Sequence, residues 1–128
     1  MTIERFEDLE IWKFAHELTK QVYEITKLGQ FNKDYKFRDQ IRASSGSIMD
    51  NIAEGFERGG NKEFTQFLFV AKGSSGEMRS QLHRAYLFEY IDKETLDNMI
   101  DKSMKLNTKI SNMITYLKNS EYKGTKYH

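Results

Sequence analysis

Apolar residues recur at alternating intervals of three and four along four long segments of the chain. The segments span residues 7–28, 34–58, 62–90 and 93–118. This spacing places the apolar side chains on one face of an α-helix, so each segment is predicted to be an amphipathic helix. The connections are short, so consecutive helices are expected to run antiparallel. The pattern therefore predicts an all-α fold, an antiparallel up-and-down four-helix bundle over residues 6–118, followed by a disordered tail over residues 119–128.

Polar and glycine residues mark the expected helix ends. Gly29 is expected to end the first helix, because glycine readily adopts the left-handed conformation that closes a helix. Asn32 or Asp34 is expected to cap the second helix. Asn61 and Asp92 stand where the third and fourth helices start, and their side-chain oxygens are expected to accept hydrogen bonds from the first turn.

Two runs of small residues lie inside the second and third segments. Residues 43–47 read Ala-Ser-Ser-Gly-Ser, and residues 71–76 read Ala-Lys-Gly-Ser-Ser-Gly. Serine and glycine are weak helix formers, but the apolar spacing continues in phase, so both runs are predicted to stay helical. A phosphate-binding loop would instead require them at a helix start. If the chain folds back at residues 59–60, the runs lie level, and we expect a tight helix crossing there beside an Arg42–Glu77 ion pair.

Composition narrows the class of protein. The 128 residues are 38% hydrophobic and 30% charged, which is typical of one globular domain. No stretch approaches the roughly 18 apolar residues of a membrane span, so we expect a cytoplasmic protein with no membrane partner. The absence of cysteine excludes disulfides and thiolate metal sites. The net charge of +1 lacks the basic excess that is typical of nucleic-acid-binding proteins.

The sequence offers little that is typical of an enzyme. A di-iron bundle requires Glu-x-x-His pairs on facing helices, and the chain has none. Arg79 and His83 are separated by three residues, at least one fewer than in the motif of helical ribonucleases. We therefore expect no catalytic residue, no metal, no cofactor and no small-molecule substrate.

Two groups of basic residues are candidate contacts for phosphate groups. One lies around the start of the second segment, and the other follows one side of the fourth. Lysine and arginine supply most of the affinity of proteins for nucleic acids, although a charged stripe on a bundle is also typical of a solvated surface. The candidate nucleic-acid-binding residues are Lys33, Lys36, Arg38, Arg42, Lys102, Lys105 and Lys109.

Several apolar residues fall outside the expected core stripes of the first and third helices. Scattered apolar residues are normal on a protein surface. Here many of them are aromatic, which favours an interface between subunits. The candidate interface residues are Trp12, Phe14, Tyr23, Phe69, Val70, Leu87 and Phe88.

Several short motifs occur together along the chain. Residues 51–55 read Asn-Ile-Ala-Glu-Gly, residues 6–12 read Phe-Glu-Asp-Leu-Glu-Ile-Trp, and residues 71–74 read Ala-Lys-Gly-Ser. Together they resemble the bacterial four-helix bundle protein family, also called the 23S rRNA intervening-sequence protein family, over about residues 6–118. Asn51 and Glu54 are expected to be structural polar groups, with a binding site as the alternative. The motif positions are Gln40, Arg42, Ser47, Asn51, Glu54, Gly55, Ser74 and Glu77.

The resemblance implies an up-and-down four-helix bundle that assembles as a homopentamer. Some members of the family are encoded inside ribosomal RNA intervening sequences. A related group, the accessory proteins of diversity-generating retroelements, is basic and binds reverse transcriptase and nucleic acid, whereas this chain is close to neutral. Two functions follow. One is a non-enzymatic oligomeric module that contacts RNA, DNA or a nucleic-acid enzyme such as a reverse transcriptase, and the other is a protein-interaction scaffold with no nucleic-acid partner.

Overall fold

The computed structural model describes residues 3–120, which form five α-helices and one 3-10 turn and contain no strand. The expected all-α class is confirmed for these residues. Most of the expected C-terminal tail, residues 121–128, lies outside the described part of the chain. Among residues 3–120, none of the helices combines the length and hydropathy of a membrane span.

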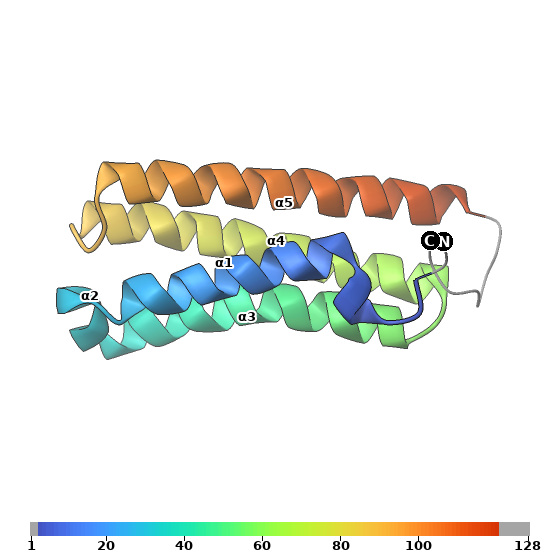
Figure 1. Ribbon diagram of the computed structural model, residues 1–128, viewed down its shortest axis with the longest axis horizontal. Coiled ribbons are helices and arrows are strands. Elements are labelled where there is room, and N and C mark those ends of the chain that lie inside the picture. The colour runs from blue at the N-terminus through green and yellow to red at the C-terminus, as the bar shows by residue number, and fades with distance from the viewer. Residues whose placement is uncertain (1–2, 121–128) are drawn as a thin grey trace.

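Four long helices lie side by side and a short helix sits at one end (Figure 1). Consecutive long helices run in opposite directions, and α3 packs against α1 and α4, while α5 packs against α4 and α1. The sequence predicted four helices and did not predict the short helix α2. The elements are η1 (Phe6–Asp8), α1 (Glu10–Thr26), α2 (Gly29–Lys33), α3 (Tyr35–Glu57), α4 (Asn61–Leu87) and α5 (Lys93–Asn119).

The expected first helix, residues 7–28, is divided into two pieces, and a further short helix follows it. Leu9 is extended, with φ −71° and ψ 131°, and it separates η1 from α1. Gly29 has a φ of +50°, as its expected role at a helix end requires, but the chain then forms α2. Phe31 explains this extra turn, because its ring is fully buried and lies 5.2 Å from the ring of Phe37. Tertiary burial over one turn leaves no periodic signal in the sequence.

Two of the expected caps are present. Asp34 accepts a hydrogen bond from the backbone N–H of Phe37 at 3.4 Å, and Asp92 accepts one from Thr95 at 2.8 Å. The hydrogen bonds from Thr95 lower the pKa of Asp92. These carboxylates satisfy N–H groups that a helix leaves without internal partners.

Both ends of α4 differ from the prediction. Gly60 takes the cap position, and Asn61 is the first residue of α4, where its amide donates to the carbonyl of Leu117 at 3.5 Å. At its far end, α4 stops at Leu87 instead of residue 90. Glu89 has a φ of +61°, and the N–H of Tyr90 bonds back to Ala85 at 2.9 Å, which closes the helix.

One continuous apolar core runs along the inside of the long helices. It is built from the expected stripes together with Phe31 of α2. Burial of each leucine, isoleucine or phenylalanine side chain stabilises the fold by roughly 1.5–3 kcal/mol. Its largest fully buried members include Leu18, Phe31, Ile41, Ile48, Ile52, Phe56, Phe64, Leu68, Met78, Leu82, Met99 and Leu106.

Both small-residue runs are helical, as predicted, and they meet, since the Ser47 and Ser74 hydroxyls lie 3.0 Å apart. A Cβ added to Gly46, Gly73 or Gly76 would meet nothing within 4 Å. The close approach is at Gly55, where an added Cβ would lie 2.7 Å from the Cβ of Phe67. The serines of the runs therefore face the neighbouring helix and their three glycines face away from it, while Gly55 faces α4.

The expected Arg42–Glu77 ion pair does not form. Arg42 Nε instead donates to Thr26 Oγ1 at 2.8 Å, and its guanidinium lies 4.5 Å from the centre of the Tyr23 ring. Arg42 therefore contacts α1, and Glu77 lies exposed on α4. The expectation failed because the numbering of a hairpin gives the level of a residue but not the side of the helix to which it points.

Candidate functional site

The Asn-Ile-Ala-Glu-Gly motif lies where α3 meets α4, and it fixes their hairpin. Asn51 Nδ2 donates to the carbonyl and to the hydroxyl of Ser47, at 2.8 and 3.0 Å. The Ser47 hydroxyl lies 3.0 Å from the hydroxyl of Ser74 on α4. Glu54 instead pairs with Arg58 at 2.8 Å on the surface, and this bond raises the pKa of Arg58. These contacts are structural, and the other motif side chains, Gln40 and Glu77, are exposed.

The first basic group separates into two kinds of residue. Lys33 and Lys36 are exposed, and neither forms an ion pair within residues 3–120. Arg38 is held by Asp39 at 3.0 Å and by the carbonyl of Asn32 at 3.0 Å. Since Arg42 is turned toward α1, the two lysines are the cations of this group that remain available to a phosphate.

At one end of the bundle, α2, the start of α3 and the α4–α5 turn meet, and we call this the α2 end (Figure 1). An aromatic cluster lies there beside these lysines. Phe31, Phe37, Phe88 and Tyr90 form it, with neighbouring ring centres 5.0 to 6.2 Å apart. The Tyr90 hydroxyl donates to Asp34 at 2.8 Å, which ties the turn to the start of α3 and raises the pKa of Tyr90. The α2 end is therefore held together by rings and one charged hydrogen bond.

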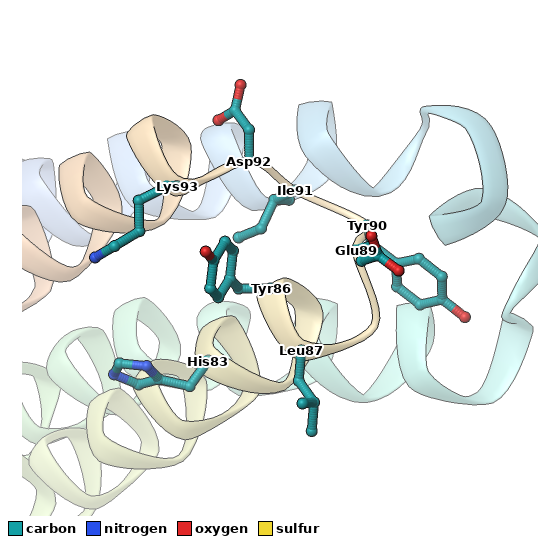
Figure 2. A pocket seen from close by; sticks show the side chains of 8 residues that line it. All are labelled: His83, Tyr86, Leu87, Glu89, Tyr90, Ile91, Asp92 and Lys93. Carbon is teal, nitrogen blue, oxygen red and sulfur yellow. The ribbon is translucent and has the colours of Figure 1, made fainter.

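Beside the cluster, the α4–α5 turn encloses an open hollow of about 920 Å³ (Figure 2). His83 and Lys93 lie toward one end of it and Glu89 toward the other, while Tyr90 points away. Lys93 pairs with Asp97 at 2.7 Å, which raises the pKa of Lys93. The sequence did not predict this hollow, because its lining comes from both sides of a turn. No group of metal-binding side chains occurs in the described part of the chain.

With this geometry in place, comparison with known proteins assigns the family. The sequence model of the 23S rRNA-intervening sequence protein family matches residues 7–125. The chain belongs to this family. The resemblance carried by the Asn-Ile-Ala-Glu-Gly motif and its companions is thus confirmed. No curated protein matches the chain.

A solved structure has the same fold as this 23S rRNA-intervening sequence protein. It is a protein of unknown function from the S23 ribosomal protein family of Bacteroides thetaiotaomicron, with a TM-score of 0.74 and 22% sequence identity. The match covers 81% of this chain and 97% of the Bacteroides chain. At this identity the likeness shows the fold alone.

In this family member the second basic group, on α5, is largely engaged by carboxylates. Lys105 lies 3.1 Å from Asp101, and Lys109 pairs with Glu10 of α1. Lys102 is half-buried and forms no ion pair among residues 3–120. Exposed ion pairs contribute little to stability, but each one lowers the positive potential that a phosphate would meet.

The candidate interface residues also fall into two groups, half-buried and exposed. Trp12 and Phe14 are half-buried and pack against the core, and Trp12 contacts Phe6 with ring centres 5.3 Å apart. The other candidates are exposed: Tyr23 by 51%, Phe69 by 47%, Val70 by 52%, Leu87 by 74% and Phe88 by 45%. Three of them lie on α4, the helix that carries Gly73 and Gly76.

Proposed function

We propose that the protein is a non-enzymatic, self-assembling binding module whose outer α4 surface, comprising Phe69, Val70, Gly73, Gly76 and Leu87, is a subunit interface. Its two glycines carry this proposal. Glycine inside a helix costs about 1 kcal/mol relative to alanine. Neither glycine has a packing reason within the protomer, since an added Cβ would meet nothing within 4 Å. The close approach of a helix from another copy supplies that reason.

The flanking side chains support the same surface. Phe69 lies one turn before Gly73, and its ring is covered only in part by Lys118, whose ammonium lies 5.0 Å from the ring centre. Leu87 is exposed by 74% at the end of α4. Subunit interfaces combine such apolar and aromatic anchors with a polar rim.

The resemblance to homopentameric relatives extends the proposal to a homopentamer. A ring requires two different surfaces on each copy, one of which meets the other on the next copy. Gly46 on the outer side of α3 resembles Gly73 on α4, because an added Cβ at either position would meet nothing within 4 Å. The exposed residues Ala43 and Asp50 lie beside it. This outer α3 surface is the proposed second half of the contact.

For the partner we propose RNA or DNA, bound at the α2 end. Lys33 and Lys36 support this, because they are exposed without ion pairs among residues 3–120. Some members of the family are encoded inside intervening sequences of ribosomal RNA, and this association of the genes with rRNA favours RNA over DNA. With a net charge of +1, one copy offers weak attraction to phosphates. Repetition around a ring strengthens weak contacts through multivalency.

A protein-interaction scaffold without nucleic acid is the second candidate. The near-neutral charge and the exposed apolar side chains on α4 favour it. Pull-down from a nuclease-treated lysate separates the two candidates. A protein partner that stays bound after nuclease treatment supports the scaffold, and loss of every bound component on nuclease treatment supports the nucleic-acid module.

The interface is tested with a single cysteine, because the chain has none of its own. In Val70→Cys, at a position of the same surface that is exposed by 52% in the protomer, modification by a maleimide is expected to slow as the protein concentration rises through assembly. The matched control is Thr108→Cys, at an exposed position of α5, which is expected to react at one rate throughout. Equal, concentration-independent rates at both positions in an assembled protein would place the interface elsewhere.

Nucleic-acid binding is tested by electrophoretic shift at several salt concentrations. Replacing Lys33 and Lys36 by alanine is expected to reduce the slope of log K against log salt by about 1.4–1.8. The matched control is Lys105→Ala, whose ammonium already pairs with Asp101 at 3.1 Å, and it is expected to change the slope less. Absence of binding at the lowest salt concentration would end the nucleic-acid proposal.

A further inference from the structure

We infer that the α2 end binds RNA through unpaired bases, which stack on the exposed rings of Tyr35 and Phe88. The inference rests on the proposed nucleic-acid function and specifies the form of RNA that the site accepts. The rings, the lysines beside them and the carboxylates of the same stretch each contribute to it.

The first observation is that both rings are exposed and yet held in place. Tyr35, the first residue of α3, is exposed by 65%, and the Arg38 guanidinium lies 4.9 Å from its ring centre. Phe88 is exposed by 45%, and its ring contacts Phe37 and Tyr90 with centres 5.8 and 5.7 Å apart. A ring that is supported by neighbours loses little conformational entropy when a base stacks on its outer side.

The second observation is the position of the cations. Lys33 and Lys36 flank Tyr35 within four consecutive residues, and both are exposed without ion pairs among residues 3–120. Arg84 lies over the Phe37 ring at 4.3 Å and likewise pairs with no carboxylate of the described chain. Aromatic platforms beside backbone-binding cations are the combination by which proteins hold single strands.

The third observation concerns the carboxylates of the same stretch, which keep their charge but are held in place by neighbouring donors. Asp34 lies between Lys33 and Tyr35, and it accepts hydrogen bonds from the Tyr90 hydroxyl at 2.8 Å and the Phe37 N–H at 3.4 Å. Asp39 is engaged by Arg38 at 3.0 Å. The hydrogen bond from Tyr90 also ties the α4–α5 turn, which follows Phe88, to the stretch that carries Tyr35. Both rings therefore lie at the same end of the bundle.

The need for bases to stack on the two rings favours unpaired over paired RNA. The bases of a duplex are covered by their neighbours, so a protein ring reaches only their edges and the backbone. In a loop or single strand the base faces are open, and each stacked base contributes about 1–3 kcal/mol. The α2 end therefore discriminates by the accessibility of base faces and not by sequence.

The test compares fluorescence anisotropy of a labelled single-stranded oligoribonucleotide of about 12 nucleotides with that of its duplex and of the DNA of the same sequence. The wild-type chain is expected to bind the single-stranded RNA more tightly than the duplex. Tyr35→Ala is expected to weaken single-strand binding about 5- to 100-fold and leave duplex binding unchanged. Tyr35→Phe, which keeps the ring, is expected to bind as the wild type does.

The control is Tyr116→Ala, an exposed tyrosine of α5 outside the α2 end, which is expected to have no effect. Circular dichroism checks that each variant keeps its helices. Equal binding of single strand and duplex, with Tyr35→Ala unchanged, overturns the inference and leaves the proposed function standing. Tighter binding of the DNA strand overturns the assignment to RNA. Absence of binding to all three probes at low salt overturns both the inference and the nucleic-acid function.

Discussion

Gly55 of α3 and Gly73 of α4 are the same residue type inside neighbouring long helices, yet their surroundings are opposite. At Gly55 an added Cβ would lie 2.7 Å from the Cβ of Phe67 and 2.9 Å from the Phe64 ring. At Gly73 an added Cβ would meet nothing within 4 Å. Helix α3 requires its glycine for contact inside the protomer, whereas α4 retains one that the protomer does not use. The difference supports the proposed subunit interface on α4.

The largest effect is expected at the inner glycine. Gly55→Ala forces α3 and α4 apart at Phe67, and it is expected to lower the free energy of unfolding by about 1–3 kcal/mol in urea denaturation. The matched variant is Gly46→Ala on the same helix, where the added methyl group has space. Equal stabilisation by the two changes would show that helix propensity and not close packing governs α3.

The polar contact that accompanies this crossing is expected to matter slightly less. Asn51→Ala removes the two hydrogen bonds that its amide donates to the carbonyl and hydroxyl of Ser47, so we expect a loss of about 1–2 kcal/mol by thermal unfolding. Gln40→Ala, an exposed position of the same motif, is the control and is expected to change stability little. A larger effect at Gln40 than at Asn51 would contradict the structural role assigned to Asn51.

Replacing the outer glycine, Gly73, is expected to raise the stability of the protomer instead of lowering it. Gly73→Ala improves helix propensity without a clash, so it should stabilise the protomer by about 1 kcal/mol at protein concentrations that keep the chain monomeric. The same methyl group should weaken assembly at higher concentration. Calorimetry over a range of concentrations measures both. A destabilised monomer would mean that Gly73 has a partner within its own chain.

The smallest effect concerns a position where glycine is favoured but absent. Glu89 has a φ of +61°, which costs an ordinary residue more than glycine. Glu89→Gly is therefore expected to stabilise the fold by about 0.5–1 kcal/mol. Glu77→Gly, a change to an exposed helical residue of α4, should destabilise it by about as much. Destabilisation by Glu89→Gly would show that the carboxylate contributes to the α4–α5 turn.

These differences explain how much the sequence could predict. Apolar spacing predicted the four long helices and the helicity of both small-residue runs, because a buried stripe needs only local periodicity. The role of Asp92 as the N-cap of the last helix was likewise predicted from the sequence. A count of residues gave the level at which the two small-residue runs meet, but the close approach at Gly55 depends on which side of α3 faces α4.

The candidate site was less predictable. Lys33 and Lys36 were identified as basic residues, but their distinction from Lys105 and Lys109 depends on partners from the folded chain. The aromatic cluster unites α2 with the α4–α5 turn, which are far apart in the sequence. Helix α2 itself exists because Phe31 is buried among those rings, and a five-residue helix offers no periodicity to detect.

Light scattering of the wild-type chain and of Gly73→Leu at micromolar concentration tests the role of the outer glycine most directly. The wild type is expected to have a mass near five times 15.1 kDa, and Gly73→Leu the mass of one chain with the same helical circular dichroism. A monomeric wild type, or a Gly73→Leu variant that assembles as the wild type does, would contradict the account.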